Sequence, residues 1–131
     1  MYKFNVPTTQ REQIIDLTPD IKDYLRKEKC DSGILVVYSP HTTAALTVNE
    51  NADPDVKRDI HYFLKKTVPQ DFGFNHAEDN ADAHIKGSLM GFSQTFIVEN
   101  GNLQLGTWQG IFLMEFDGPR TREVWLKFIS D

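Results

Sequence analysis

The sequence predicts a mainly β (α+β) protein, a β-sandwich of antiparallel strands with two short helices. Short apolar and β-branched runs recur along the chain, turn-forming residues separate them, and only two segments begin with a clear helix signal. The chain has 131 residues, the usual size of one domain, and shows no internal repeat. We therefore expect a single domain over residues 1–131.

Several segments have the composition of strands. The first two alternate between apolar and polar residues, whereas Ile34–Tyr38 is continuously apolar, which is typical of a strand buried on both faces. Asn100 and Gly101 predict a hairpin between two later strands. The expected strands are Tyr2–Val6, Gln13–Leu17, Ile34–Tyr38, Ala44–Val48, Thr95–Val98, Leu103–Leu105, Gly110–Phe116 and Val124–Ile129.

A capping residue followed by proline marks two helix starts. Thr18 before Pro19 predicts a helix over residues 19–28 whose free amides the threonine hydroxyl caps. Asp53 before Pro54 predicts a helix over residues 54–67. Its apolar residues recur at helical spacing and should form the packed face: Val56, Ile60, Phe63 and Leu64.

The segment after the second helix is harder to assign. Residues 68–82 have no periodicity and read as a long loop, a type of segment that is often functional in a small domain. His84–Met90 could be a short helix capped by Asp82, although Gly87 and Gly91 weaken that interpretation.

Composition excludes several functional classes. The net charge is -5 and basic residues are scattered among acidic ones, so we expect no nucleic-acid partner. No segment resembles a signal peptide or a membrane span, so we expect no membrane partner and a cytoplasmic location. Cys30 is the single cysteine, which excludes an internal disulfide and a multi-cysteine metal site.

The first polar segment, Ser39–Asn51, follows a predicted strand and places His41 at a strand edge. A histidine there can bind a metal through one ring nitrogen, or transfer protons near neutral pH. The alternative is that His41 and the neighbouring threonines only satisfy the polar ends of a turn.

The second polar segment gathers imidazoles and carboxylates, the ligands that suit zinc and related ions: His76, Glu78, Asp79, Asp82 and His84. His76 and His84 do not share a helical face by the i, i+4 rule, so only a folded loop could bring them together. The alternative is a solvated acidic loop. We exclude His61, which lies between Lys57 and Lys65 on the flank of the second helix that we expect to be exposed.

The third polar segment begins at Gly106 and ends at Arg122. Trp108 between two glycines suits a stacking surface for a planar group, or a tight turn with the indole as a core plug. Arg120 and Arg122 stand beside carboxylates, and form either a clamp for an anion or a set of structural ion pairs.

The motifs in these segments identify a family resemblance over essentially the whole chain. The sequence resembles the YjbQ family, also called the secondary thiamine-phosphate synthase enzyme family. The motifs that carry the resemblance are His41-Thr42-Thr43, Asn49 to Val56, His76 with Ala83-His84-Ile85-Lys86 and Gly91, and Leu105 to Phe112. Their order along the chain is more specific than any one of them.

The resemblance implies a β-sandwich subunit in a homotrimer, with histidines that hold a divalent metal, zinc or magnesium. It also implies a low thiamine-phosphate synthase activity, which joins a pyrimidine methyl diphosphate to a thiazole phosphate and expels pyrophosphate. By position, the implied metal ligands are His41, His76 and His84, and the implied catalytic residues are His41, Glu50 and His84. The implied substrate-binding residues are Thr42, Asn49, Lys86, Trp108, Gln109 and Arg120.

The leading hypothesis is therefore a metal-assisted enzyme acting on a phosphorylated small molecule, in which folding gathers the three histidines into one pocket. One alternative is a trimeric module that binds a metal or anion without turnover. Another is a metal-dependent phosphoester hydrolase that uses the same residues to activate water.

Overall fold

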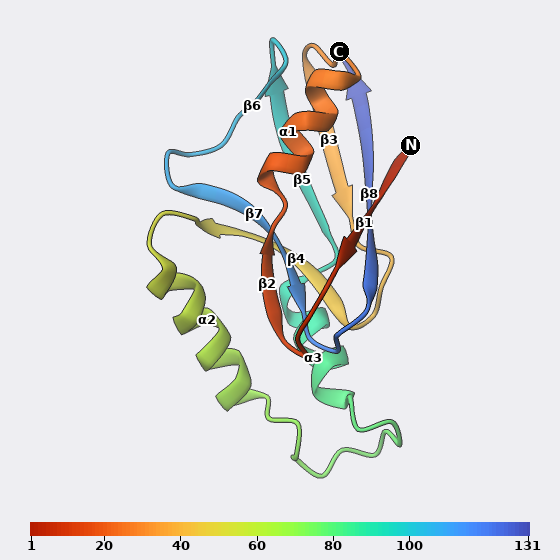
Figure 1. Cartoon of the computed structure of the whole chain (residues 1–131), viewed down its shortest axis with the longest axis vertical. Coiled ribbons are helices and arrows are strands. Elements are labelled where there is room, and N and C mark those ends of the chain that lie inside the picture. The colour runs from red at the N-terminus through yellow and green to blue at the C-terminus, as the bar shows by residue number, and fades with distance from the viewer.

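The computed structural model describes residues 1–131 and contains two antiparallel sheets and three helices. Sheet A has the strand order β1-β8-β3-β5-β6, and sheet B has the order β2-β7-β4 (Figure 1). The strands are β1 Tyr2–Pro7, β2 Gln13–Asp16, β3 Gly33–Tyr38, β4 Ala44–Glu50, β5 Ser93–Glu99, β6 Asn102–Leu103, β7 Gln109–Glu115 and β8 Thr121–Ser130. The helices are α1 Thr18–Lys27, α2 Pro54–Thr67 and α3 Ala81–Met90. The mainly β class is confirmed.

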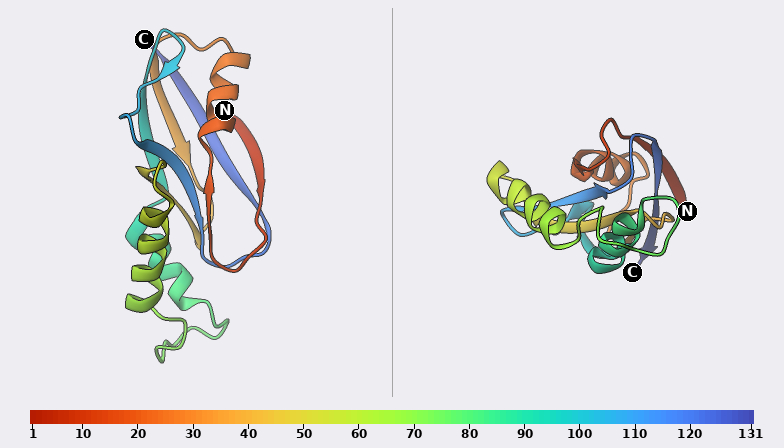
Figure 2. Two further views of the ribbon diagram at one scale, coloured as in Figure 1. Left: turned by 60° about the vertical axis from the view of Figure 1, so that its left-hand side comes forward. Right: turned by 90° about the horizontal axis from the view of Figure 1, so that it is seen from below.

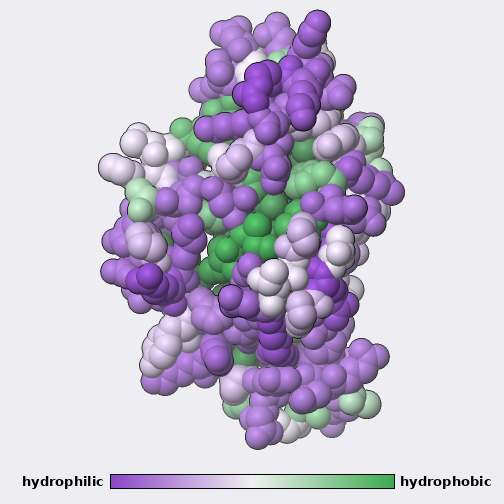
Figure 3. Space-filling view, viewed as in Figure 1, coloured by the Kyte–Doolittle hydropathy of each residue, from purple (hydrophilic) through white to green (hydrophobic).

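The main hydrophobic core is built from both sheets and α1. Leu35 and Leu126 come from sheet A, Leu46 and Leu113 from sheet B, and Ile21 from α1, and all five are buried. Figure 2 shows α1 close to the strands, whereas α2 and α3 lie toward the other end of the molecule. On the face drawn in Figure 3, polar side chains cover most of the surface and apolar ones reach it near the centre.

Helix α1 begins at Thr18, one residue before its predicted start, and the Thr18 hydroxyl does not cap it. The Leu17 position caps the helix without a side-chain hydrogen bond, and Thr18 Oγ1 instead accepts the backbone N–H of Ile111 at 2.9 Å. A buried amide in β7 needs an acceptor, and the threonine supplies it. The hydroxyl therefore joins α1 to sheet B rather than closing the helix end.

Helix α2 matches its predicted bounds, and Asp53 caps it as predicted by accepting the N–H of Asp55 at 2.9 Å. The predicted packed face is wrong in part. Leu64 is buried, but Phe63 is 64% exposed, and α2 projects from the side of the sheets (Figure 1). Helical spacing shows which residues share a face, but it cannot show whether a partner covers that face.

The ambiguous segment is a third helix, so the expectation of two helices is wrong. Gly87 weakened the sequence signal, but its lack of a side chain is needed: a Cβ there would lie 3.1 Å from both the Thr42 carbonyl oxygen and the Phe92 ring. Asn80, not Asp82, occupies the N-cap position. None of the three helices has both the length and the apolar composition needed to cross a membrane.

The outer face of sheet A corrects the prediction that β3 is buried on both faces. Burial alternates along β3, and Ile34 and Tyr38 are exposed. Ile34 stands between Ile97 of β5 and Ile129 of β8 in the strand register, so three exposed isoleucines form a row across the sheet. The apolar run of β3 therefore leaves one open apolar face on this chain.

Candidate functional site

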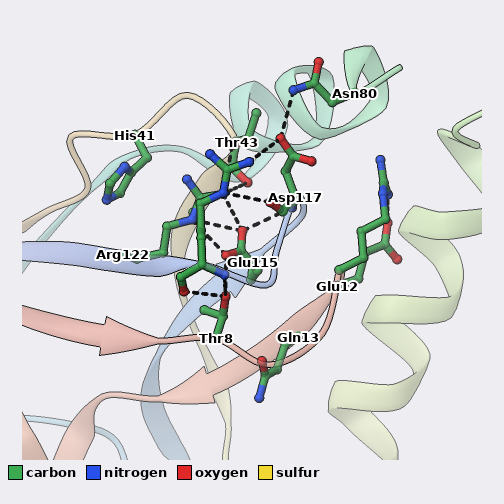
Figure 4. Close-up of polar contacts among 12 residues, drawn as sticks. Thr8, Glu12, Gln13, His41, Thr43, Asn80, Glu115, Asp117 and Arg122 are labelled. Atoms are coloured by element: carbon green, nitrogen blue, oxygen red, sulfur yellow. Dashed lines mark hydrogen bonds and ion pairs between the residues drawn. The ribbon is translucent and has the colours of Figure 1, made fainter. Parts of the chain in front are cut away.

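A buried ion pair lies where β4, β7 and β8 meet near α3. Arg122 Nε donates to both carboxylate oxygens of Glu115, at 2.9 and 3.0 Å, and Nη2 donates to Glu115 and to Thr43 Oγ1. Thr8 Oγ1 donates to Glu115 at 2.8 Å (Figure 4). Arg122 therefore forms a structural ion pair with Glu115, and its guanidinium is not available to bind an anion from outside the chain.

Arg120 occupies the rim of the same region. Its guanidinium is half-exposed and its Nη2 lies 3.0 Å from Asp117 Oδ2, which also accepts Asn80 Nδ2 at 2.8 Å. Asn80 Oδ1 is buried and has no hydrogen-bond partner in the chain (Figure 4). A buried amide oxygen of this kind calls for a donor or a cation from outside the chain. This end of the molecule therefore offers a half-exposed guanidinium whose Nη1 donors have no partner in the chain, and an unused acceptor.

His41 is half-buried beside the Arg122 network. Its Nε2 accepts the backbone N–H of Glu123 at 2.9 Å, so the neutral ring carries its proton on Nδ1. No ring-nitrogen lone pair remains free, and the expectation that His41 is a metal ligand is not met in this arrangement. The ring can instead donate a hydrogen bond through Nδ1.

We expect the free energy of unfolding to decrease as the pH is lowered, because of His41. Burial lowers the pKa of His41 below its ordinary value of 6.5, and the nearby Arg122 charge lowers it further. The unfolded chain therefore binds a proton from about pH 6.5 downward while the folded chain still resists it, so the free energy of unfolding falls as pH falls through that window. Urea unfolding at pH 7.5 and 5.5 should show a smaller pH difference for H41Q than for the parent; an equal difference would contradict the assignment.

His76 and His84 form a close pair although nothing local in the sequence brings them together. The loop before α3 folds back so that the two ring centroids lie 5.2 Å apart, with the planes at 75°. Glu78 lies beside His76, with 3.7 Å between its Oε2 and His76 Nε2. The folded loop that the spacing requires is present.

The rest of the predicted metal cluster does not assemble. Asp79 accepts a hydrogen bond from Gln70, Asp82 is buried in ion pairs, and no set of three His, Cys, Asp or Glu side chains lies close enough to hold a metal. The prediction that folding gathers the three histidines into one pocket is therefore wrong for a single chain. Catalytic zinc usually has three protein ligands, so the pair fits a divalent metal only in part, and further ligands would have to come from a substrate, water or a second copy.

Lys86 lies on a different side of α3 from His84, because residues two positions apart in a helix do not share a face. Its ammonium is 1% exposed and contacts Glu12 Oε1 at 2.5 Å and Asp82 Oδ2 at 3.0 Å. Arg11 also binds Asp82, at 2.9 Å. Arg11 and Glu12 are not among the predicted site residues, since the β1–β2 connection carries no motif that singles them out.

Trp108 lies at the opposite end of sheet B from the histidines. It is 62% exposed in a tight turn, so it is not a core plug. Gln109 pairs with Glu50 and Gly110 with Asn49, whereas the other end of the same ladder pairs Ala44 with Glu115. Six residue steps of strand separate these ends by roughly 20 Å. Thr42 is the neighbour of His41 in the chain and lies at the other end of sheet B from Trp108. The predicted pocket residues therefore lie in two separate regions of one chain.

Comparison with known proteins identifies the family. The model of the UPF0047 protein YjbQ-like family matches residues 2–131. A UPF0047 protein of Methanocaldococcus jannaschii is 52% identical over 100% of this chain and 95% of its own length, and the UPF0047 protein YugU of Bacillus subtilis is 47% identical over 95% and 96%.

Solved structures agree. A crystal structure of a YjbQ/UPF0047 protein from Clostridium acetobutylicum has a TM-score of 0.95 at 50% identity, covering 98% of this chain and 100% of the other. A hypothetical protein from Aeropyrum pernix has a TM-score of 0.94 at 39% identity, covering 99% and 98%. Since both sequence and fold match over nearly the whole length, the chain belongs to the UPF0047 (YjbQ-like) family.

Proposed function

We propose that the protein is a metal-assisted enzyme acting on a phosphorylated small molecule, with a low thiamine-phosphate synthase activity as its detectable reaction. The observation that carries the proposal is the His76–His84 pair, since two half-exposed imidazoles are held 5.2 Å apart by a folded loop. The family resemblance supplies the expected reaction. The single domain, the two packed sheets and the absence of a membrane-spanning helix suit a β-sandwich enzyme of the cytoplasm.

Each group at this end has a chemical role in such a reaction. A divalent cation held by His76 and His84 would neutralise the charge of a diphosphate. Arg120 has unpaired guanidinium donors at the rim that can bind a phosphate group. His41 can donate a hydrogen bond from its Nδ1–H to a leaving oxygen, since its other nitrogen already accepts a backbone N–H.

We also propose that the protein works as a homotrimer. The exposed isoleucine row on sheet A continues into the Tyr38–Trp125 ring pair, whose centroids lie 5.8 Å apart, and an apolar face of this kind favours a protein partner. Trp108 and Gln109 lie too far from the histidines to share a ligand within one chain. A site between copies would bring the stacking surface of one copy to the metal-binding end of the next.

Sedimentation equilibrium tests the trimer. We expect the parent to sediment at three times the 15.1 kDa chain mass. I97E should shift toward the monomer, because a carboxylate in this exposed row would lose its hydration when the proposed trimer interface covers it. F63E changes an equally exposed residue on α2 and should leave the mass unchanged. A monomeric parent, or an I97E variant that stays trimeric, would contradict the proposed interface.

Replacing His84 by alanine tests the enzyme proposal. We expect H84A to lose most bound zinc and to reduce thiamine-phosphate synthesis by at least about tenfold, in line with the effect of removing a group that supports a catalytic metal. Metal content by mass spectrometry and product formation from the two phosphorylated substrates are the measurements. S88A, one turn along α3 and exposed, is the control.

The outcomes of this experiment separate the alternatives. Loss of metal with synthesis unchanged favours a module that binds a metal or anion without turnover. Release of inorganic phosphate in place of the joined product favours a phosphoester hydrolase. Unchanged metal and unchanged synthesis would remove the histidine pair from the function.

A further inference from the structure

A second polar cavity lies on the other side of α3 from the histidine pair. Its volume is about 290 Å³, just below the roughly 300–1,000 Å³ range of small-molecule sites. Its walls come from the β1–β2 connection, α2, α3 and the loop between the helices, and contain no hydrophobic residue: Gln10, Arg11, Glu12, His61, Lys65, Gln70, Asp82 and Lys86. Four segments far apart in the sequence thus converge on one polar space.

The expectation that His61 lies on an exposed flank of α2 is wrong in part, because His61 lines this cavity. His61 Nε2 lies 3.5 Å from Glu12 Oε2, and His61 and Lys65 line the cavity together with residues of the β1–β2 connection. Figure 4 shows Glu12 directed toward α2 and away from the Arg122 network. The i, i+4 spacing of His61 and Lys65 places both side chains on the same side of the cavity.

The hydrogen-bonding balance of this cavity leaves donors without acceptors. Both oxygens of Glu12 and both of Asp82 already contact Arg11, Lys86 or His61. Three cations face two carboxylates, and Lys65 is exposed and makes no ion pair or side-chain hydrogen bond within the chain. An incoming ligand therefore meets a free ammonium and spare Arg11 donors, and finds no free carboxylate oxygen.

We propose that this cavity is a second ligand site, which binds a small phosphate-bearing anion through Lys65, with Arg11 and His61 beside it. A phosphate group supplies several strong acceptor oxygens, which match the unused donors. The two ionised carboxylates do not repel it strongly, because each is neutralised by a contacting cation. The site does not depend on the histidine pair, so it holds whether or not the proposed reaction is correct.

Titration with inorganic phosphate, followed by amide chemical shifts in NMR spectra, tests this site at constant ionic strength set with chloride. We expect saturable shifts at Gln10 to Glu12 and around His61, and at least roughly tenfold weaker binding in K65A, because a charge-assisted contact is lost. K66A is the matched control, since Lys66 is the next residue of α2 and reaches only Tyr62. H84A should bind phosphate as the parent does.

Shifts that do not saturate, or equal weakening by K65A and K66A, would overturn the proposal. A parallel titration with glycerol phosphate separates free phosphate from a phosphate monoester, since an organic ligand that uses the whole cavity should also shift the amide of Gln70. If H84A abolishes phosphate binding, the anion occupies the histidine end and not this cavity.

Discussion

Replacing Arg122 by methionine should lower the free energy of unfolding by about 3–5 kcal/mol. Arg122 is 2% exposed and Glu115 is fully buried, so the variant leaves a carboxylate in the interior without its counter-charge. Urea unfolding of the parent and R122M at neutral pH measures the loss. R120M is the matched control, because Arg120 pairs with Asp117 at the surface and should contribute less than about 1 kcal/mol.

A double variant separates loss of the charge pair from loss of packing. R122M combined with E115Q removes both charges, so it should recover part of the stability that R122M loses. If R122M costs less than about 1 kcal/mol, or E115Q fails to rescue it, the Arg122–Glu115 pair does not hold the ends of β7 and β8 together. The position of His41 over that pair would then lack its support.

Replacing Lys86 by methionine should cost about 3 kcal/mol of unfolding free energy. Lys86 lies between Glu12 and Asp82 with its ammonium buried, and methionine removes the charge from both partners. Lys66 is exposed on α2, so K66M should change stability by less than about 0.5 kcal/mol. Chemical unfolding at pH 7 checks both values, and a near-neutral K86M would show that Arg11 alone satisfies Asp82.

The same variant should change the response to acid. Burial by itself raises the pKa of Asp82, but hydrogen bonds from Arg11 and Lys86 outweigh it and hold the pKa below its ordinary value of 3.8. The stability from this carboxylate is complete above pH 3.8 and is lost as pH falls through the lowered pKa. K86M should therefore unfold at a higher pH than the parent during acid titration; identical acid midpoints would contradict this.

Local signals explain which parts of the fold could be read from the sequence. The Asp53-Pro54 signal predicts both ends of α2 together with its periodicity, and Asn100 and Gly101 both adopt positive φ, 51° and 80°, at the predicted hairpin. Helix α3 was obscured because Gly87 is disfavoured in an isolated helix but is required by close packing against Thr42. Tertiary packing decides such a position, and propensity does not.

The site was predictable by residue type but not by arrangement. The His76–His84 pair needs a loop conformation that no short-range pattern specifies. Glu12 and His61 lie far apart in sequence, and their contact depends on how α2 is positioned relative to the β1–β2 connection. The apolar run of β3 predicts burial on both faces, but burial alternates along the strand, because an apolar run alone does not show which of its faces the chain covers.

The central claim is that His76 and His84 hold a divalent metal at the site of reaction. An anomalous-difference map recorded at the zinc edge, from crystals of the zinc-loaded protein, tests it most directly. If the two histidines bind the metal, the map has a peak within bonding distance of both imidazoles, about 2.0–2.1 Å from each nitrogen. A zinc-loaded protein with no peak beside the pair, or with the two rings turned apart, would contradict it.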